Sequence, residues 1–186
     1  MATSDPLFAP ITIGSFEARN RVLMAPMTRG RATPNGTPTE IMATYYGQRA
    51  GAGAIIAEAT SISVQGRGWV NAPGIYSDHQ AEMWRPVTRA VHDAGGGIFL
   101  QLWHMGRVSH PDFQENDALP VGPSAIAAEG EAHTPHGKKA YVTPRPLAAD
   151  ELPGIVDDFV AGAGRAIDAG FDGVEIHGAN GYLIDQ

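Results

Sequence analysis

The sequence contains no cysteine, so disulfide bonds and thiolate zinc sites are excluded. It also lacks long apolar runs. Stretches such as residues 52–57 are far shorter than the ~20 residues of a membrane-spanning helix. The first five residues show no basic segment leading into an apolar one, so no secretory signal is predicted. We therefore expect a cytoplasmic protein with no membrane partner.

Basic residues are scarce as well. Thirteen Lys and Arg against 20 Asp and Glu leave a formal net charge of -7. This charge opposes non-specific binding to nucleic acid or to an anionic membrane surface, so we expect neither partner. The 186 residues are 43% hydrophobic and 18% charged, which is typical of a folded globular chain with a sizeable core. A small molecule, not a polyanion, is the expected substrate.

Short aliphatic runs alternate with helical patterns along the chain, which predicts an α/β fold with a parallel sheet wrapped by helices. The expected strands are residues 21–27, 54–59, 98–103 and 173–177.

Three helical patterns separate these strands. The first is expected to begin at Thr37 and end at Gly51, and the second to begin with a capping box at Ser77 and to kink at Pro86. The third covers residues 150–168. Its helical spacing predicts a buried stripe made of Val156, Phe159, Val160, Ala163 and Ile167.

Two other patterns do not predict sites of their own. The glycine clusters at 51–53 and 95–97 close helices, whereas a dinucleotide-binding loop follows a strand and opens a helix. His133 and His136 are the nearest approach to a metal-ligand pair, but no carboxylate lies at ligand spacing. No metal site is predicted.

Residues 174–182 hold the densest group of reactive side chains. An apolar strand is followed by His177, Asn180 and Tyr182 within six positions. An imidazole and a carboxamide at the end of a strand can both donate hydrogen bonds to one oxygen, and a phenol close by can supply a proton. A lone histidine beside a strand is more often structural, so the prediction depends on the cluster. We interpret this segment as the edge of an active site.

Four separated segments resemble, in order and spacing, the motifs of the old yellow enzymes, and most closely those of the bacterial type. They are residues 20–29, 71–75, 101–107 and 177–183. Old yellow enzymes are flavin-dependent ene reductases that fold as TIM (β/α)8 barrels and carry FMN. The resemblance implies that residues 1–186 form the N-terminal half of such a barrel, covering about the first four strand-helix units. A proline-rich insertion after the third strand, about residues 105–149, is expected to form a cap over the substrate pocket, with a flexible linker between two domains as the alternative.

The resemblance also assigns residues to the cofactor. Thr28 is expected to donate to the flavin O4, and Gln101 to pair with the pyrimidine edge, because its amide is both donor and acceptor. Trp103 is expected to line the substrate pocket. The full set of implied FMN contacts is Pro26, Met27, Thr28, Ala59, Gln101 and His177.

The implied reaction is the reduction of activated C=C bonds in α,β-unsaturated carbonyl or nitro compounds, with NADPH or NADH as the reductant. In this reading His177 and Asn180 bind the carbonyl oxygen and Tyr182 is the proton donor. Hydride addition to the β-carbon moves negative charge onto that oxygen, where fixed donors stabilise it.

The chain departs from the family pattern in its length. A full barrel needs ~250 residues, and in the family the later strand-helix units hold the FMN phosphate. Four parallel strands alone expose two edges and an apolar inner face. We therefore expect that the chain is either a fragment of a longer reductase or one half of an assembly, covered by a complementing half-barrel or by self-association. The alternative function is a catalytically silent half-barrel that needs a partner chain to complete the flavin site.

Overall fold

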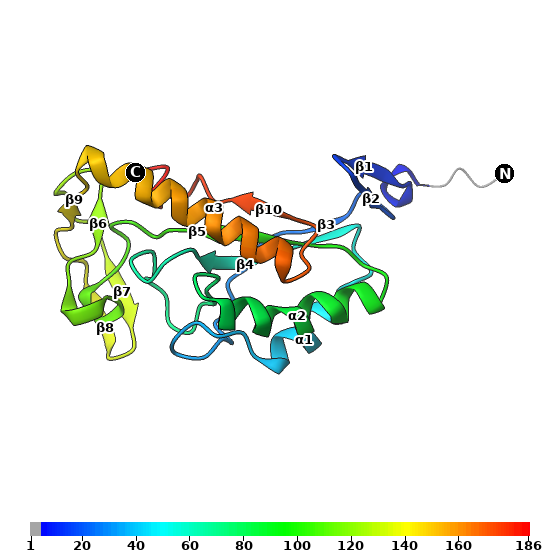
Figure 1. The fold of residues 1–186 in the computed structure, drawn as a ribbon, viewed down its shortest axis with the longest axis horizontal. Helices are drawn as coiled ribbons and strands as arrows, with labels where there is room; N and C mark the ends of the chain where they lie inside the picture. Colours follow the sequence, from blue (N-terminus) through cyan, green and yellow to red (C-terminus); the bar gives the residue numbers. More distant parts are fainter. Residues whose placement is uncertain (1–4) are drawn as a thin grey trace.

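The computed structural model describes residues 5–186 and is built around a four-stranded parallel sheet (Figure 1). In spatial order its strands are β10 (Gly173–Ile176), β5 (Ile98–Trp103), β4 (Ala54–Ser61) and β3 (Leu23–Met24). Neighbouring strands are also consecutive in the β/α repeat. The helices α1 (Glu40–Gly47), α2 (Asp78–Asp93) and α3 (Leu152–Asp168) connect them in turn. This is the repeating unit of a (β/α)8 barrel, as predicted.

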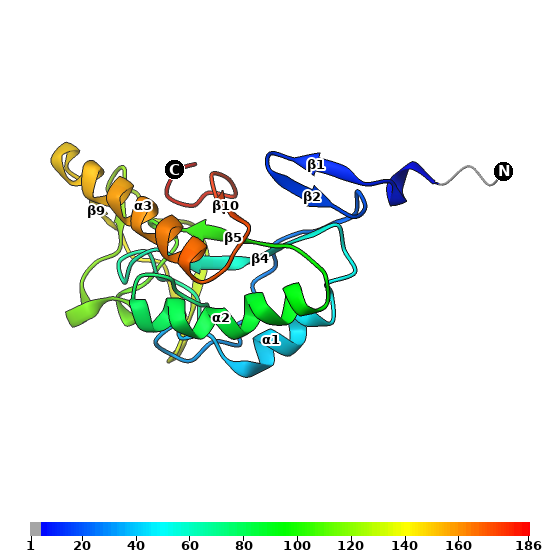
Figure 2. The ribbon, with the colours of Figure 1, turned by 45° about the vertical axis from the view of Figure 1, so that its right-hand side comes forward.

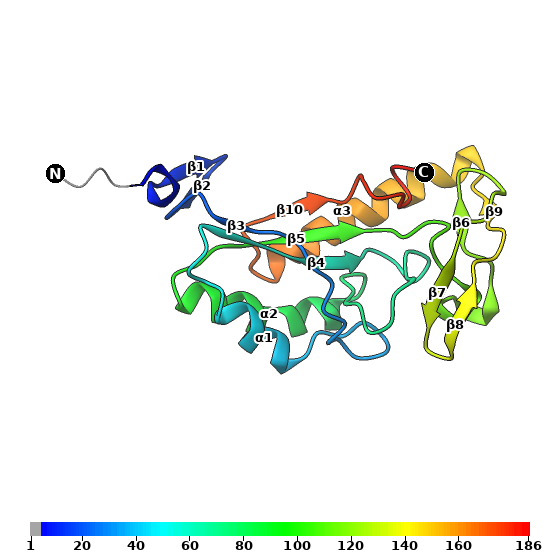
Figure 3. The same cartoon turned by 180° about the vertical axis from the view of Figure 1, so that it is seen from behind.

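The helices lie on one face of the sheet. Figure 2 shows α1, α2 and α3 on the outer side of the strands, and in Figure 3, seen from behind, β10 and β5 lie in front of α3 while α1 and α2 lie below β4. The core fills the space between the two layers. Its main strand members are Ile55, Ile98, Leu100 and Leu102, and its main helix members are Met42, Tyr46, Trp84, Val87, Val91 and Ala166.

Strand β5 shows how the sheet separates its two faces. Ile98, Leu100 and Leu102 belong to the core under the helices. Side chains alternate along a strand, so Gln101 and Trp103 point to the opposite, concave face. Among residues 5–186, no helix has both the length and the apolar composition that crossing a bilayer requires.

An N-terminal hairpin lies at the end of the sheet where the strands begin (Figure 1). It consists of β1 (Ile11–Ile13) and β2 (Phe16–Ala18), paired antiparallel. The Phe16 ring meets the Phe99 ring edge-on, with centroids 5.4 Å apart, and Gly97 leaves the room that Phe16 needs. The hairpin therefore covers the amino-terminal end of β5.

The helix boundaries partly differ from the predictions. Helix α1 begins at Glu40 with Thr39 as its N-cap, so the predicted start at Thr37 was wrong. The capping box between Ser77 and Gln80 is confirmed. Pro86 was expected to kink or split the second helix. Helix α2 is not split, since it runs unbroken from Asp78 to Asp93, and Pro86 lies on its exposed side.

The predicted buried stripe of α3 was largely wrong. Val156, Val160 and Ile167 are 59%, 65% and 55% exposed. The helix instead meets the sheet through its small residues: a Cβ on Gly162 would lie only 3.3 Å from Ile62, and Ala166 is fully buried. The close approach turns the large aliphatic side chains away from the sheet. Val156 lines an open apolar groove together with Leu152 and Ile184, and Val160 and Ile167 are exposed further along the helix.

Residues 105–149 lie beyond the carboxyl ends of β4 and β5, whose arrowheads point toward them in Figure 3. This segment includes the hairpin of β7 (Glu131–Thr134) and β8 (Gly137–Ala140), and the parallel pair of β6 (Val121–Gly122) and β9 (Arg145–Pro146).

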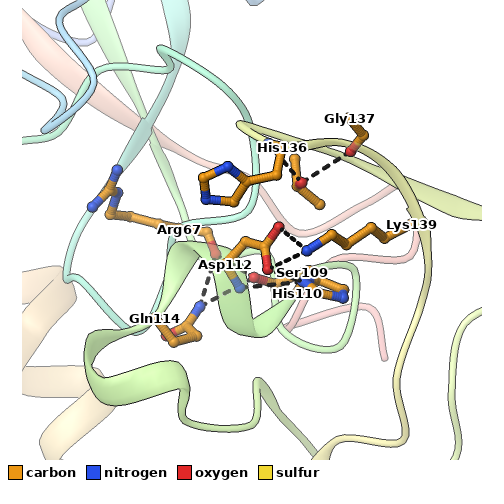
Figure 4. A network of polar contacts seen from close by, with 9 residues as sticks. Arg67, Ser109, His110, Asp112, Gln114, His136, Gly137 and Lys139 are labelled. Atoms are coloured by element: carbon orange, nitrogen blue, oxygen red, sulfur yellow. Dashed lines mark hydrogen bonds and ion pairs between the residues drawn. The ribbon is translucent and has the colours of Figure 1, made fainter.

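A polar network ties the hairpin to the rest of the segment (Figure 4). The Asp112 carboxylate meets the Lys139 ammonium at 2.8 Å and His110 at 3.1 Å. The hydrogen bond from Lys139 lowers the pKa of Asp112 to about 2. The Gln114 amide donates to the Arg67 carbonyl at 3.1 Å, which joins the network to the loop after β4.

The contact between α2 and α3 generates a test of stability. The buried Thr88 hydroxyl donates to the Ala169 carbonyl at 2.7 Å. Thr88→Val keeps the shape and leaves this carbonyl without its donor, so we expect the free energy of unfolding to fall by about 1 to 2 kcal/mol in urea denaturation. Thr12→Val is the control, because its hydroxyl bonds Glu17 on the exposed hairpin. An equal loss in both variants would contradict this account.

Candidate functional site

The candidate site lies where the strands of the sheet end. The carboxyl ends of parallel strands in a barrel meet at one face, and catalytic residues of barrel enzymes lie there. Thr28 follows β3, Ala59 lies near the end of β4, Trp103 ends β5, and His177 directly follows β10. The topology therefore brings the predicted residues to the same edge of the sheet.

An aromatic cluster forms the centre of this edge. The Trp103 and Tyr182 rings stand perpendicular with centroids 4.8 Å apart, and the His177 ring lies 4.9 Å from that of Tyr182. The Trp103 and His177 rings are nearly parallel at 6.2 Å. Ala59 packs in the same cluster as Trp103. The structure thus brings together four of the predicted residues from three strands.

Backbone hydrogen bonds hold the cluster in place. The His177 N–H donates to the Leu102 carbonyl at 3.0 Å, so this residue continues the pairing of β10 with β5. The Leu183 N–H donates to the His104 carbonyl at 3.1 Å. These two contacts fix the segment between them, including Tyr182, against the end of β5.

Asn180 occupies the turn of this segment. Its φ of 59° lies in the left-handed region, which asparagine tolerates better than most residues, and Gly181 follows at 74°. This pair reverses the chain and brings Tyr182 back over Trp103. The Asn180 side chain is exposed, and no hydrogen bond within residues 5–186 uses its amide. The carboxamide therefore lies in the turn two positions before Tyr182, with no hydrogen-bond partner among residues 5–186.

The environment sets the protonation state of the cluster. Burial lowers the pKa of the His177 imidazole, while the Glu175 carboxylate opposes this shift. Burial raises the pKa of the Tyr182 phenol, and Tyr141 raises it further. At neutral pH the site therefore presents a neutral imidazole and a protonated phenol.

Gln101 has a partner that the sequence did not predict. Its side chain is 7% exposed and its Nε2 donates to Glu175 Oε1 at 2.6 Å. The two residues are direct neighbours in the register of β5 and β10. The contact orients the amide and leaves its oxygen unpaired within residues 5–186. A carboxylate at the matching position of the adjacent strand is the signal that would have found Glu175.

Pro26, Met27 and Thr28 lie on the loop after β3, at the opposite side of the sheet from β10. Met27 is 57% exposed, and the other two are half-buried. No ring or hydrogen-bond contact joins these three residues to the aromatic cluster within the described chain. The loop is instead held by Glu58, a fully buried carboxylate in β4 that the sequence reasoning missed. An acidic residue within an otherwise apolar strand was the available signal.

These residues fit the ring of a flavin. Gln101 retains a hydrogen-bond acceptor for an imide N–H, and the Thr28 hydroxyl can donate to a ring carbonyl. The half-buried, neutral His177 and Tyr182 provide hydrogen-bond donors at the same strand ends. The hydrogen-bonding groups of this site therefore suit a redox ring with a polar pyrimidine edge. They also suit a substrate that carries an oxygen atom and lies on one face of that ring.

Comparison with known proteins agrees with this geometry. An old yellow enzyme homologue from Zymomonas mobilis is 58% identical, with a TM-score of 0.94 over 97% of this chain and 50% of its own. Morphinone reductase, solved in complex with tetrahydroNAD, is 49% identical with a TM-score of 0.91 over 96% of this chain and 51% of its own. The 12-oxophytodienoate reductase 1 of Oryza sativa subsp. japonica is 47% identical and is covered over 48% of its length.

The chain thus spans about half the length of the relatives it matches. The model of the NADH:flavin oxidoreductase / NADH oxidase family matches residues 6–186. The matched solved structures are barrels, and this chain, with its four-stranded sheet, corresponds to about half of them. The chain therefore belongs to the NADH:flavin oxidoreductase / NADH oxidase family, that of the old yellow enzymes, and forms one half of its barrel.

Proposed function

We propose that the protein is an FMN-dependent oxidoreductase that reduces activated C=C bonds with NADPH or NADH, and that this chain supplies the substrate-binding half of its site. The observation that carries the proposal is the convergence of His177, Tyr182 and Trp103 at the strand ends. The names of matched relatives, morphinone reductase and 12-oxophytodienoate reductase, support a small enone-type substrate. A cytoplasmic location stays a prediction from the sequence.

His177 and Asn180 bind the oxygen of the substrate. FMN, when bound and with a nicotinamide as its reductant, would supply the hydride for the β-carbon of an α,β-unsaturated carbonyl or nitro compound. Negative charge then accumulates on the substrate oxygen. A neutral imidazole N–H and the exposed carboxamide N–H stabilise this charge as it develops, and a donor of this kind is commonly worth ~3 kcal/mol.

Tyr182 delivers the proton that completes the reaction. Its O–H bond breaks as a C–H bond forms at the α-carbon, so the alkene gains one hydride and one proton. The raised pKa keeps the phenol protonated at neutral pH. Because the side chain is only half-buried, solvent can return the proton to the phenolate. Trp103 packs edge-on to this phenol and lines the substrate pocket.

The cofactor contacts follow from the strand ends. Gln101 would accept from the imide N–H of the ring through its unpaired oxygen, and the Thr28 hydroxyl would donate to a ring carbonyl. His177, which follows β10, would contact the same ring. The remaining members of the proposed set, which would contact the ring through backbone or apolar atoms, are Pro26, Met27 and Ala59.

The exposed surface of α3 favours a second structural partner. An apolar groove of about 450 Å³ runs between this helix and the last residues, and it is lined in part by Val156, Phe159, Leu183 and Ile184. Leu183 and Ile184 lie in the segment that follows β10, an edge strand of the sheet. We propose that the second half of a barrel, in the same protein or in a partner chain, covers this groove and pairs with the edge strands, because the matched relatives are twice as long. Without it, the chain is the catalytically silent half-barrel of the alternative function.

The assembly can be tested with residues 1–186 alone. We expect this chain to self-associate in size-exclusion chromatography with light scattering, and to lose FMN on purification. Co-expression with the second half of the Zymomonas mobilis relative should give a complex that contains one copy of each chain and is yellow because it retains FMN. The pair Val156→Ser and Ile184→Ser, both in the groove, should reduce self-association, whereas Ile126→Ser, an exposed isoleucine outside the groove and away from the edge strands, should not. A compact monomer that retains FMN would contradict the proposal.

The proton donor can be tested by separating the two half-reactions in stopped-flow measurements of the flavin-loaded protein. Tyr182→Phe should slow alkene reduction by about a hundredfold or more, because the general acid is lost, and leave flavin reduction by NADPH nearly unchanged. Tyr76→Phe is the matched control, since its hydroxyl bonds the Asn35 carbonyl outside the site. Equal slowing of both half-reactions would exclude Tyr182 as the donor.

The protonation state of His177 depends on its neighbour in β10. The Glu175 carboxylate stabilises the imidazolium, so Glu175→Gln should lower the pKa of His177 further below its ordinary value. The change is measured by following the His177 Cε1–H resonance against pH. Glu40→Gln removes the same charge from exposed α1, on the helix face of the sheet, and should leave the titration unchanged. A raised or constant pKa in the Glu175 variant would refute the coupling.

A further inference from the structure

Glu58 is a fully buried carboxylate at 0% exposure in the apolar strand β4. A carboxylate in such a place is unfavourable unless hydrogen bonds compensate for the lost water. Burial raises the pKa of Glu58, and hydrogen bonds from three donors lower it again in part. The contacts that these donors make show what the residue holds.

One oxygen of Glu58 binds the loop after β3. Its Oε2 accepts from the Arg29 N–H at 2.9 Å and from the Gly30 N–H at 3.4 Å. The other oxygen, Oε1, accepts from the Tyr46 hydroxyl at 3.0 Å, and the same hydroxyl oxygen accepts from the Glu58 N–H at 2.9 Å. Glu58 and Tyr46 therefore join β4, α1 and this loop.

The loop has few other anchors. Strand β3 contains only Leu23 and Met24. Beyond the strand pairing, the backbone N–H groups of residues 25–31 that bond within the described chain are those of Arg29 and Gly30, and both bond Glu58. Thr28 directly precedes this pair. The position of the Thr28 backbone therefore depends on the carboxylate.

We propose that Glu58 is a positioning residue that fixes the loop of residues 26–30 and so sets the contact of Thr28 with the flavin ring. The inference rests on the proposed function. It adds a residue that touches neither cofactor nor substrate and that acts through the Thr28 backbone. Tyr46 is its support, because the hydroxyl clamps the second carboxylate oxygen against α1.

The geometry requires a carboxylate and not merely a polar side chain of the same size. The Arg29 N–H, the Gly30 N–H and the Tyr46 O–H all point at Glu58 as donors. An ionised carboxylate accepts from all three. A glutamine would turn its NH2 group toward one of these donors and lose that contact. Glu58→Gln is therefore a small change in shape with a specific effect on the loop.

The first test measures the hold on the loop by amide hydrogen exchange of the flavin-loaded protein. In wild type, the Arg29 and Gly30 amides should be protected. In Glu58→Gln their exchange should accelerate by about tenfold or more. Glu129→Gln, which removes the same charge from an exposed site, should change neither amide. Tyr46→Phe keeps the carboxylate and should accelerate these amides less than Glu58→Gln does.

The second test asks whether the effect on the flavin passes through Thr28. Glu58→Gln should shift the midpoint potential of the bound flavin, and Thr28→Ala should shift it as well. In the double variant the Glu58 change should add no further shift, because the contact that it positions is already gone. A residue with only a general structural role would give additive shifts or none.

The outcomes separate this inference from the proposed function. Wild-type protein, assembled with its complementing half, that binds no flavin overturns the proposed function and the Thr28 contact with it. If wild-type protein binds flavin but its Arg29 and Gly30 amides exchange freely, the inference alone is overturned. This outcome is measured on wild type, so it does not depend on whether a variant folds. Additive potential shifts in the double variant also overturn the inference alone.

Discussion

The two-residue alternation of β5 is the constraint on which the rest of the structure depends. Ile98, Leu100 and Leu102 must face the helices to form the core, and this turns Gln101 and Trp103 to the concave face. A slip of one residue would bury the amide under α2 and expose three aliphatic side chains. The apolar core therefore fixes the position of the polar site, and the register with β10 places Glu175 beside Gln101.

Two acidic residues organise the site without belonging to its reactive centre: Glu58, which is fully buried, and Glu175, which is half-buried. Glu58 holds the loop that carries Thr28, whereas Glu175 orients the Gln101 amide and opposes the fall in the His177 pKa that burial causes. Taking a carboxylate out of water is unfavourable, and both carboxylates compensate through hydrogen bonds from groups that the site needs in fixed places. The reactive side chains thus stay neutral, and the two carboxylates act on the site through the residues that they contact. Hydrogen-bond donors held in fixed positions in this way are preorganised for the reaction.

The sequence predicted the sheet and the aromatic cluster because their signals are local. Strand β5 matched its predicted residues, and β10 ended one residue early. Glu58 and Glu175 escaped prediction because their partners lie 29 and 74 positions away, so only the fold reveals them. The stripe of α3 failed for a related reason. A helical pattern identifies an apolar face but does not say whether the sheet or another element covers it, and here Gly162 takes the contact with the sheet.

That failure bears on how the site is completed. Val156 and Val160 are more than half exposed although they follow the spacing of a buried face. Val156 lines the apolar groove together with Leu183 and Ile184, which lie in the segment that follows the edge strand β10. The same strand leads into His177, Asn180 and Tyr182. An element that covers this groove must therefore also border the segment that binds the substrate oxygen. The element that closes the barrel therefore also shapes the substrate pocket, because the reactive cluster lies next to the surface that this element covers.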